Sequence, residues 1–202
     1  SAACDFVVNC IEKVGLGGKV SLALDIASTQ FFADGKYILS RENRALSPTE
    51  FINYLLDLVS TQPIISIEDP LAEDDWDSWA LFMLNAPKNL QVVGDDLFTT
   101  NAARLARGVA DRSANAILIK PNQNGLVTFT ESVLKMAQGE GFRTIVSARS
   151  GETEDSWLAD LATGWRAEQI KVGSTHGSDR NAKWNRLLEL EATEKTTFAQ
   201  PF

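Results

Sequence analysis

Short apolar runs recur along the chain, and a segment with helical periodicity follows most of them. The runs are rich in Val, Ile and Leu and lie at residues 20–24, 63–67, 91–94, 116–119, 144–147 and 169–172. Most are apolar at consecutive positions, as in strands that helices bury on both faces. A strand that alternates with a helix in this way predicts an α/β fold in which about six βα units carry parallel strands.

Capping residues mark the starts of the intervening helices. The clearest start is at Ser47, Pro48 and Glu50, which supply an N-cap hydroxyl, a proline at the first helical position and a capping-box carboxylate. Further helices are expected at residues 5–14 and 129–136, after Asp74 or Asp75, over 101–109 with Thr100 as the cap, after Thr153 and after Ser178. The turn Asp34-Gly35 predicts a small hairpin. No low-complexity linker interrupts residues 1–202, so we expect one domain.

Composition and charge exclude several classes of function. The 202 residues are 44% hydrophobic and 23% charged, which is the balance of a globular protein. The 19 Lys and Arg residues against 27 Asp and Glu residues give a formal charge of −8, which repels phosphate backbones, so we expect no nucleic acid partner. No apolar stretch approaches the roughly 20 residues of a membrane span, and no signal-peptide pattern opens the sequence.

Cysteine and histidine content narrows the chemistry further. Cys4 and Cys10 have neither the spacing of a disulfide framework nor that of a zinc site, and a cytoplasmic location fits this usage. The sole histidine is His176, which nearly removes Ser-His-Asp, Cys-His and multi-histidine metal chemistry. We interpret His176 as a solvated loop residue, because it lies between Gly173 and Gly177.

Ionisable residues follow the apolar runs at the points where the strands are expected to end. They are Asp25, Glu68 with Asp69, Asp95 with Asp96, Lys120, Arg149 and Lys171. If neighbouring strands are parallel, these side chains converge on the carboxyl-end face of the sheet, where α/β folds build their sites. The carboxylates of Asp25, Glu68 and Asp95 form a set of hard oxygen ligands that suits Mg²⁺. Burying these three charges would be costly without a cation.

Several of these residues also have an ordinary structural interpretation. A carboxylate at a turn or helix start is stabilised by the helix N-terminus, which could explain Asp69, Asp74, Asp75 and Asp96. Lys171 could be a surface residue at a strand end, and Arg149 and Ser150 could cap the next helix. Lys120 directly follows apolar residues, so we interpret it as functional, since a desolvated lysine can act as a base.

Blocks of sequence at these positions resemble the glycolytic enolases. They are Leu24-Asp25-Ile26-Ala27, Ser66-Ile67-Glu68-Asp69-Pro70 followed by Glu73-Asp74-Asp75-Trp76, Val93-Gly94-Asp95-Asp96-Leu97, Ile117-Leu118-Ile119-Lys120 with Asn122-Gln123, Arg149-Ser150-Gly151-Glu152-Thr153-Glu154-Asp155, and Gln169-Ile170-Lys171. Their order and spacing match over nearly the whole chain. The resemblance implies the C-terminal part of an enolase-type (β/α)8 TIM barrel, without the N-terminal domain and the first barrel strands.

The resemblance also implies a reaction, a cofactor and roles for named residues. The reaction is the Mg²⁺-dependent, reversible dehydration of 2-phosphoglycerate to phosphoenolpyruvate in glycolysis, catalysed by phosphopyruvate hydratase, a carbon-oxygen lyase. A lysine base combined with Mg²⁺ is a known pattern of the enolase superfamily. The resemblance assigns Mg²⁺ binding to Asp25, Glu68 and Asp95, the general base to Lys120, and binding of the phosphorylated carboxylate substrate to Arg149, Ser150 and Lys171. Enolases often act as homodimers, so we expect a full-length form to be one.

Two departures from the family pattern matter. Ala148 stands where enolases have a histidine beside the substrate, so the substrate or the chemistry could differ. A complete (β/α)8 barrel needs about 250 residues, and the family's proton-donating glutamate has no counterpart in these 202. We therefore expect a C-terminal fragment, or a chain that pairs with another, with little or no turnover on its own.

Two other functions stay open at this point. An enolase homologue of phosphonate metabolism, similar to carboxyphosphonoenolpyruvate synthase, would account for Ala148. A partial barrel could instead serve as a non-catalytic binding or scaffold surface. That second function predicts that the folded chain binds no Mg²⁺.

Overall fold

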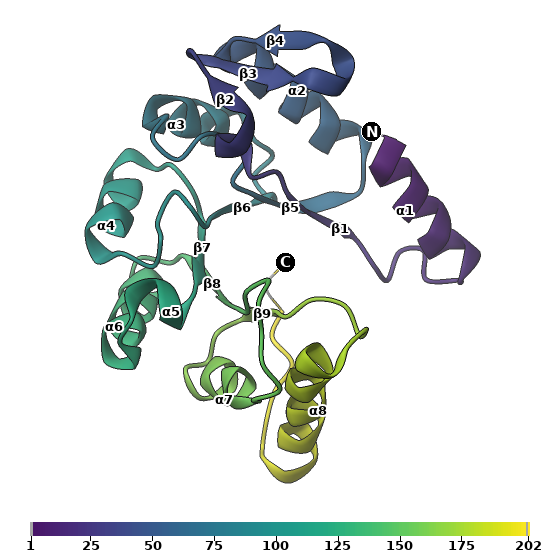
Figure 1. Ribbon diagram of the computed structural model, residues 1–202, viewed down its shortest axis with the longest axis vertical. Helices are drawn as coiled ribbons and strands as arrows, with labels where there is room; N and C mark the ends of the chain where they lie inside the picture. Colours follow the sequence, from purple (N-terminus) through teal and green to yellow (C-terminus); the bar gives the residue numbers. More distant parts are fainter. Residues whose placement is uncertain (1, 201) are drawn as a thin grey trace. The chain divides into compact units, whose positions relative to one another are not determined.

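The computed structural model describes residues 2–200 and 202, and the chain groups into two compact units. Unit 1 comprises residues 1–97 with 108–114, and unit 2 comprises residues 98–107 with 115–202. Helix α4 (Ala102–Asp111) has residues in both units. Each unit has its own parallel strands and its own helices (Figure 1).

The parallel strands of unit 1 are β1 (Leu22–Asp25), β5 (Ile64–Glu68) and β6 (Gln91–Gly94), in that order across the sheet. Asp25 is the register partner of Glu68, and Glu68 is the partner of Val93. These strands therefore end at one edge of the sheet, as expected of neighbouring parallel strands. The three corresponding strand predictions are confirmed to within two residues at each end.

Helix α2 (Pro48–Thr61) begins where its capping residues predict. The Ser47 hydroxyl accepts the backbone N–H of Glu50, and the Glu50 carboxylate accepts the backbone N–H of Ser47 at 2.8 Å. The helix buries Phe51, Ile52, Leu55 and Val59 on its apolar face. Unit 1 also contains α1 (Ala2–Lys13) and α3 (Trp76–Asn85), which overlap the helices predicted there.

A small antiparallel sheet forms around the predicted Asp34-Gly35 turn. It consists of β2 (Phe32–Ala33), β3 (Lys36–Leu39) and β4 (Arg44–Leu46), with 3-10 turns at Ser28–Phe31 and Ser40–Glu42. The hairpin is confirmed, whereas β4 went unpredicted because its three residues are too few to show a pattern. The fully buried ring of Tyr37 stacks on Phe51, with ring centroids 4.3 Å apart, and so packs the small sheet against α2.

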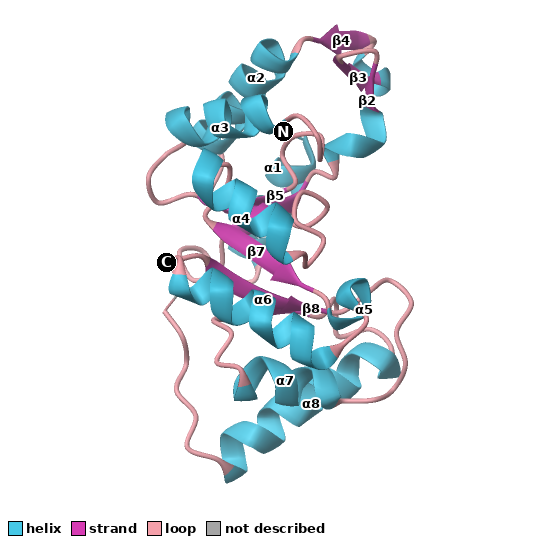
Figure 2. Ribbon diagram, turned by 90° about the vertical axis from the view of Figure 1, so that its left-hand side faces the viewer, coloured by secondary structure: helices cyan, strands magenta, loops and turns pink. Residues whose placement is uncertain are grey.

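The parallel strands of unit 2 are β7 (Ala116–Ile119), β8 (Arg143–Ser147) and β9 (Gln169–Lys171). Helix α6 (Val127–Gly139) packs across β7 and β8 (Figure 2), and α7 (Trp157–Gly164) packs beside α8 (Ser178–Thr193). The short helix α5 (Pro121–Asn124) directly follows β7. Among the described residues, no helix is both long and apolar enough to cross a bilayer.

Burial separates the predicted strands into two groups. Every residue of β6 and β7 is buried, and β5 and β8 are buried at all but one position each. In contrast, β1 buries Leu22 alone and β9 has no buried residue. The prediction of strands buried on both faces is thus confirmed for β5 to β8 and wrong for β1 and β9. Among the described residues, β1 pairs only with β5 and β9 only with β8, so one edge of each lacks a covering strand.

The start of helix α4 differs from the prediction. Asn101, and not Thr100, caps it, because Asn101 Oδ1 accepts the backbone N–H groups of Ala103 at 2.9 Å and Arg104 at 3.2 Å. Thr100 is fully buried and has a φ of 52°, in the left-handed region. Its hydroxyl therefore serves other partners, which lie near Lys120.

Candidate active site

Three carboxylates stand at the strand ends of unit 1. Asp25 ends β1, Glu68 ends β5, and Asp95 directly follows the last residue of β6. Glu68 and Asp95 are buried, with 6% and 8% of their surface exposed, whereas Asp25 is exposed. The expected cost of burying charge therefore applies to Glu68 and Asp95. The expectation that Asp25 is also buried is wrong, because β1 is a partly exposed strand.

Asp69 links the ends of β5 and β6. Its backbone N–H donates to Val93 O at 3.0 Å, and its carboxylate accepts the backbone N–H groups of Asp95 and Asp96 at 2.9 and 2.8 Å. This arrangement agrees with the structural interpretation of Asp69 as a carboxylate at a turn, which the sequence allowed as one interpretation. The stabilising donors are two backbone amides of the neighbouring strand end, and not a helix N-terminus.

Asp69, Asp95 and Asp96 form the group of described residues that could hold a metal ion, because each offers one carboxylate oxygen and these three oxygens lie within 4.8 Å of one another. This group shares Asp95 with the predicted set of Asp25, Glu68 and Asp95. Burial raises the pKa of Asp69 to about 7; the two backbone hydrogen bonds lower it, and the carboxylates of Asp95 and Asp96 raise it. Carboxylate oxygens are the ligands that Mg²⁺ prefers, and a cation would offset the repulsion among them. The residues present therefore fit Mg²⁺.

In unit 2, Lys120 follows β7 and is half-buried. Its backbone N–H donates to the Thr100 hydroxyl at 3.0 Å, and that hydroxyl donates to Gln123 Oε1 at 2.9 Å. Asn124 Nδ2 donates to the carbonyl of Thr100 at 3.1 Å. Thr100 thus holds the backbone from which the Lys120 side chain extends.

The predicted substrate-binding residues, two after β8 and one at the end of β9, lie at the surface of unit 2. Arg149, Ser150 and Lys171 are exposed. Arg149 Nη1 donates to Asn122 Oδ1 at 2.9 Å, and the backbone N–H of Ala148 donates to the carbonyl of Lys171 at 2.9 Å. Arg149 and Ser150 do not cap α7, whose N-cap is Ser156. The exposed position of Lys171 agrees with both interpretations of that residue.

Two cations of α8 went unnoticed in the sequence. Arg180 donates to the backbone carbonyls of Arg149 and Ser150, and Lys183 donates to that of Thr153. Lys183 is fully buried. A signal for it existed, since Lys183 lies four and seven residues before Leu187 and Leu190 and so shares their helix face.

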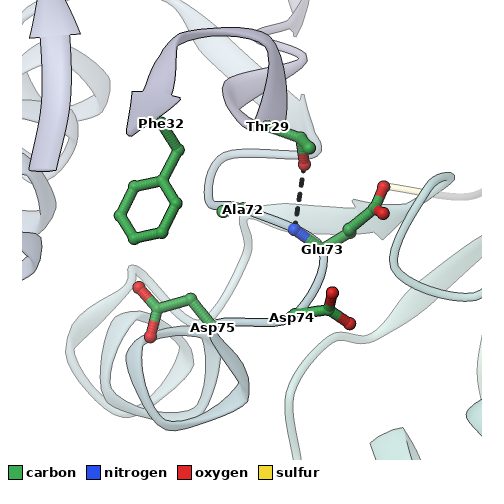
Figure 3. Close-up of a pocket in the computed structure, with 6 residues that line it drawn as sticks. All are labelled: Thr29, Phe32, Ala72, Glu73, Asp74 and Asp75. Carbon is green, nitrogen blue, oxygen red and sulfur yellow. Dashed lines mark hydrogen bonds between the residues drawn. The ribbon is translucent and has the colours of Figure 1, made fainter. Parts of the chain in front are cut away.

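Unit 1 also contains an open cavity of about 390 Å³, lined by Thr29, Phe32, Ala72, Glu73, Asp74 and Asp75 (Figure 3). The backbone N–H of Glu73 donates to the Thr29 hydroxyl at 2.9 Å, as Figure 3 shows. Asp75 is the N-cap of α3, but its side chain makes no cap hydrogen bond. Its carboxylate instead accepts the Tyr37 hydroxyl at 3.2 Å, so Asp75 joins the small sheet to the start of the helix.

A known family covers nearly the whole sequence. The family model described as "Enolase, C-terminal TIM barrel domain" matches residues 1–200. The parallel strands and packed helices of the two units agree with part of such a barrel, so the predicted fold class is confirmed. Enolases are lyases that generally use Mg²⁺, for which the carboxylates of unit 1 are suitable ligands. The chain therefore belongs to the enolase family, as a C-terminal TIM barrel domain.

Proposed function

We propose that this chain forms the metal- and substrate-binding barrel of an enolase that reversibly dehydrates 2-phosphoglycerate to phosphoenolpyruvate in glycolysis. The observation that carries the proposal is the pairing of Asp25 with Glu68 at the ends of two parallel strands, with Asp95 directly after the third. Membership of the enolase family supports the same chemistry.

In this proposal the ligands of Mg²⁺ are Asp25, Glu68 and Asp95. When bound, the ion would stabilise the negative charge that the substrate carboxylate gains as the C2 proton leaves. Two of these carboxylates are buried, so a cation offsets the cost of their charge. Asp69 fixes the backbone at Asp95 and thereby the direction in which this carboxylate leaves the strand end.

The cationic residues of unit 2 would bind the anionic substrate. Lys120, half-buried after β7, is the proposed general base for the C2 proton. Lys171 would pair with the substrate carboxylate, and Arg149 with Ser150 would hold the phosphate. A guanidinium suits this role because its planar set of N–H donors matches phosphate oxygens. The exposed side chain of Arg149 is accessible to such a ligand.

Ala148 supports a second candidate within the same chemistry, an enolase homologue of phosphonate metabolism. The residue lies between the end of β8 and Arg149, where enolases have a histidine beside the substrate. In either case we propose that the 202-residue chain turns over little or no substrate by itself, because it has no counterpart of the family's proton-donating glutamate. Robust dehydration of 2-phosphoglycerate by the purified chain would contradict that part of the proposal.

Calorimetric titration of Mg²⁺ into the folded chain tests the metal site. Glu68→Gln should lower the Mg²⁺ affinity by about tenfold or more, because it removes one of the charges that bind the ion. Asp74→Asn is the matched control, since it removes an exposed carboxylate that lines the cavity of unit 1. Failure of the folded wild-type chain to bind Mg²⁺ would overturn the proposal and favour the scaffold function. So would a loss of affinity in Asp74→Asn but not in Glu68→Gln.

A further inference from the structure

Helix α8 holds the segment that follows β8, residues 148–155, which we name the β8 loop. Arg180 Nη1 donates to the carbonyl oxygens of Arg149 at 2.7 Å and Val172 at 3.0 Å, and Arg180 Nη2 donates to that of Ser150 at 3.0 Å. One guanidinium thus ties the backbone of the two proposed phosphate-binding residues to the residue that follows β9.

Lys183 anchors the same loop three residues further along α8. Its Nζ donates to the carbonyl oxygen of Thr153 at 2.6 Å and lies 3.0 Å from Glu152 Oε2. The other carboxylate oxygen of Glu152 accepts the backbone N–H of Arg149 at 2.8 Å. A continuous path of polar contacts therefore runs from the Lys183 ammonium through Glu152 to the backbone of Arg149.

Stability alone does not explain these two cations. The Lys183 side chain is 0% exposed, and burying an ammonium is costly unless it is paired and hydrogen-bonded. Well-packed apolar residues in place of a whole buried ion pair, here Lys183 with Glu152, are often neutral or stabilising by comparison. Arg180 also depends on a special backbone position: Gly173 has a φ of 119°, and a Cβ there would lie 3.3 Å from Arg180 Cδ. Both side chains thus occupy restrictive positions and converge on one exposed loop.

We propose that Arg180 and Lys183 are positioning residues that hold Arg149 and Ser150 ready for the phosphate group of the substrate. This inference rests on the proposed function of the β8 loop. Both cations bind backbone carbonyls, while the side chains of Arg149 and Ser150 are exposed and accessible to a ligand. Fixing the loop before the ligand arrives reduces the ordering entropy that binding must overcome.

Calorimetry on the 202-residue chain, with Mg²⁺ present, tests this role with 2-phosphoglycerate and with glycerate, which lacks the phosphate. Lys183→Met and Arg180→Lys should each lower the affinity for 2-phosphoglycerate by about tenfold or more. Their affinities for glycerate and for Mg²⁺ should stay within about twofold of wild type, because neither ligand uses the β8 loop. A general loss of structure would weaken all three titrations together.

Arg186→Lys is the matched control on the same helix. Arg186 pairs with Asp160 at 2.7 Å and with Glu189 at 3.1 Å, and neither residue belongs to the β8 loop. This variant should bind 2-phosphoglycerate as wild type does. If Lys183→Met fails to fold, Arg180→Lys keeps the test intact, since it retains a cation at a partly exposed position.

Hydrogen–deuterium exchange of residues 148–155 measures, without any ligand, how strongly Arg180 and Lys183 restrain the backbone of the β8 loop. Exchange in this loop should be faster by about tenfold or more in Lys183→Met and in Arg180→Lys, and unchanged in Arg186→Lys. Unchanged exchange overturns the inference. So does wild-type affinity for 2-phosphoglycerate in both variants, an outcome that leaves the proposed function standing. A wild-type chain that binds Mg²⁺ but not 2-phosphoglycerate overturns the proposed substrate, and the phosphate role of the loop with it.

Discussion

Asp69 Oδ1 accepts the backbone N–H of Asp95 at 2.9 Å, so the residue after β5 fixes the backbone of the residue after β6. Asp69 has a φ of 41°, a left-handed conformation that aspartate adopts more readily than most residues. The same carboxylate therefore closes a turn, links two strand ends and orients a proposed Mg²⁺ ligand. These three roles account for an ionisable group that is buried to 3% exposure.

The first prediction concerns pH and the metal-free chain. Burial raises the pKa of Asp69 from 3.8 to about 7, so the folded state binds this proton more tightly than the unfolded state does. The stabilisation is complete below about pH 4 and is lost as the pH rises through about 7. Relative to Asp69→Asn, which cannot titrate, the wild-type free energy of unfolding should fall by the order of a few kcal/mol between those limits. Urea unfolding of both proteins across this pH range tests the prediction. If the difference between their free energies of unfolding does not vary with pH, the raised pKa of Asp69 is contradicted.

The second prediction concerns the support of Lys120. Thr100→Val keeps the β-branched shape but removes the hydroxyl that accepts the Lys120 N–H and donates to Gln123. The free energy of unfolding should fall by about 1–3 kcal/mol, because the backbone N–H of Lys120 loses its partner at a part-buried position. Thr99→Val is the control: Thr99 also has a positive φ, but its half-exposed hydroxyl donates only to the adjacent carbonyl of Phe98. Equal effects of the two variants in urea unfolding would refute the special role of Thr100.

Local patterns predicted the parts of the fold that local chemistry determines. Runs of consecutive apolar residues located the six strands, and the capping box located the start of α2. Once the strands are parallel neighbours, their register brings Asp25 beside Glu68, so the strand-end carboxylates were predictable too. The exposure of Asp25 could not be predicted, because it depends on which strands cover β1.

Contacts between distant segments could not be predicted from the sequence. Thr100 has the residue type of an N-cap, but a part-buried hydrogen bond to Gln123, 23 residues away, gives its hydroxyl another use. The pattern of α8 could have indicated that Lys183 is buried. That pattern could not have indicated that Lys183 binds the carbonyl of Thr153, which lies 30 residues earlier in the sequence. Tertiary packing chooses among the partners that a side chain's chemistry permits.

The third prediction concerns the junction of the small sheet with α3. Burial raises the pKa of Tyr37, and its hydroxyl donates to Asp75 while accepting the backbone N–H of Ala72 at 3.0 Å. Tyr37→Phe leaves that buried N–H without its partner and should lower the free energy of unfolding by about 1–3 kcal/mol. Tyr54→Phe, at a half-buried position of α2, should change it by less than about 0.5 kcal/mol. Thermal or urea unfolding distinguishes the two variants, and similar losses in both would contradict the role given to the Tyr37 hydroxyl.

The fourth prediction concerns Ala148, which is half-buried and directly precedes Arg149. Its backbone N–H donates to the carbonyl of Lys171. An imidazole there would lie beside the residues proposed to bind the carboxylate and the phosphate. With an ordinary pKa of about 6.5, it would be mostly cationic at about pH 6 and neutral at about pH 8. Ala148→His should therefore strengthen 2-phosphoglycerate binding by about fivefold or more at the lower pH, and much less at the higher pH.

Ala148→Gln is the control for that experiment, because it adds a polar side chain of similar size without a titratable charge. Calorimetry at both pH values, with Mg²⁺ present, separates the effect of charge from the effect of bulk. A pH-dependent gain in Ala148→His alone would place position 148 beside the bound substrate, as the family pattern implies. Equal behaviour of the two variants would show that the missing histidine does not set substrate affinity, and would remove the observation that favours a phosphonate substrate.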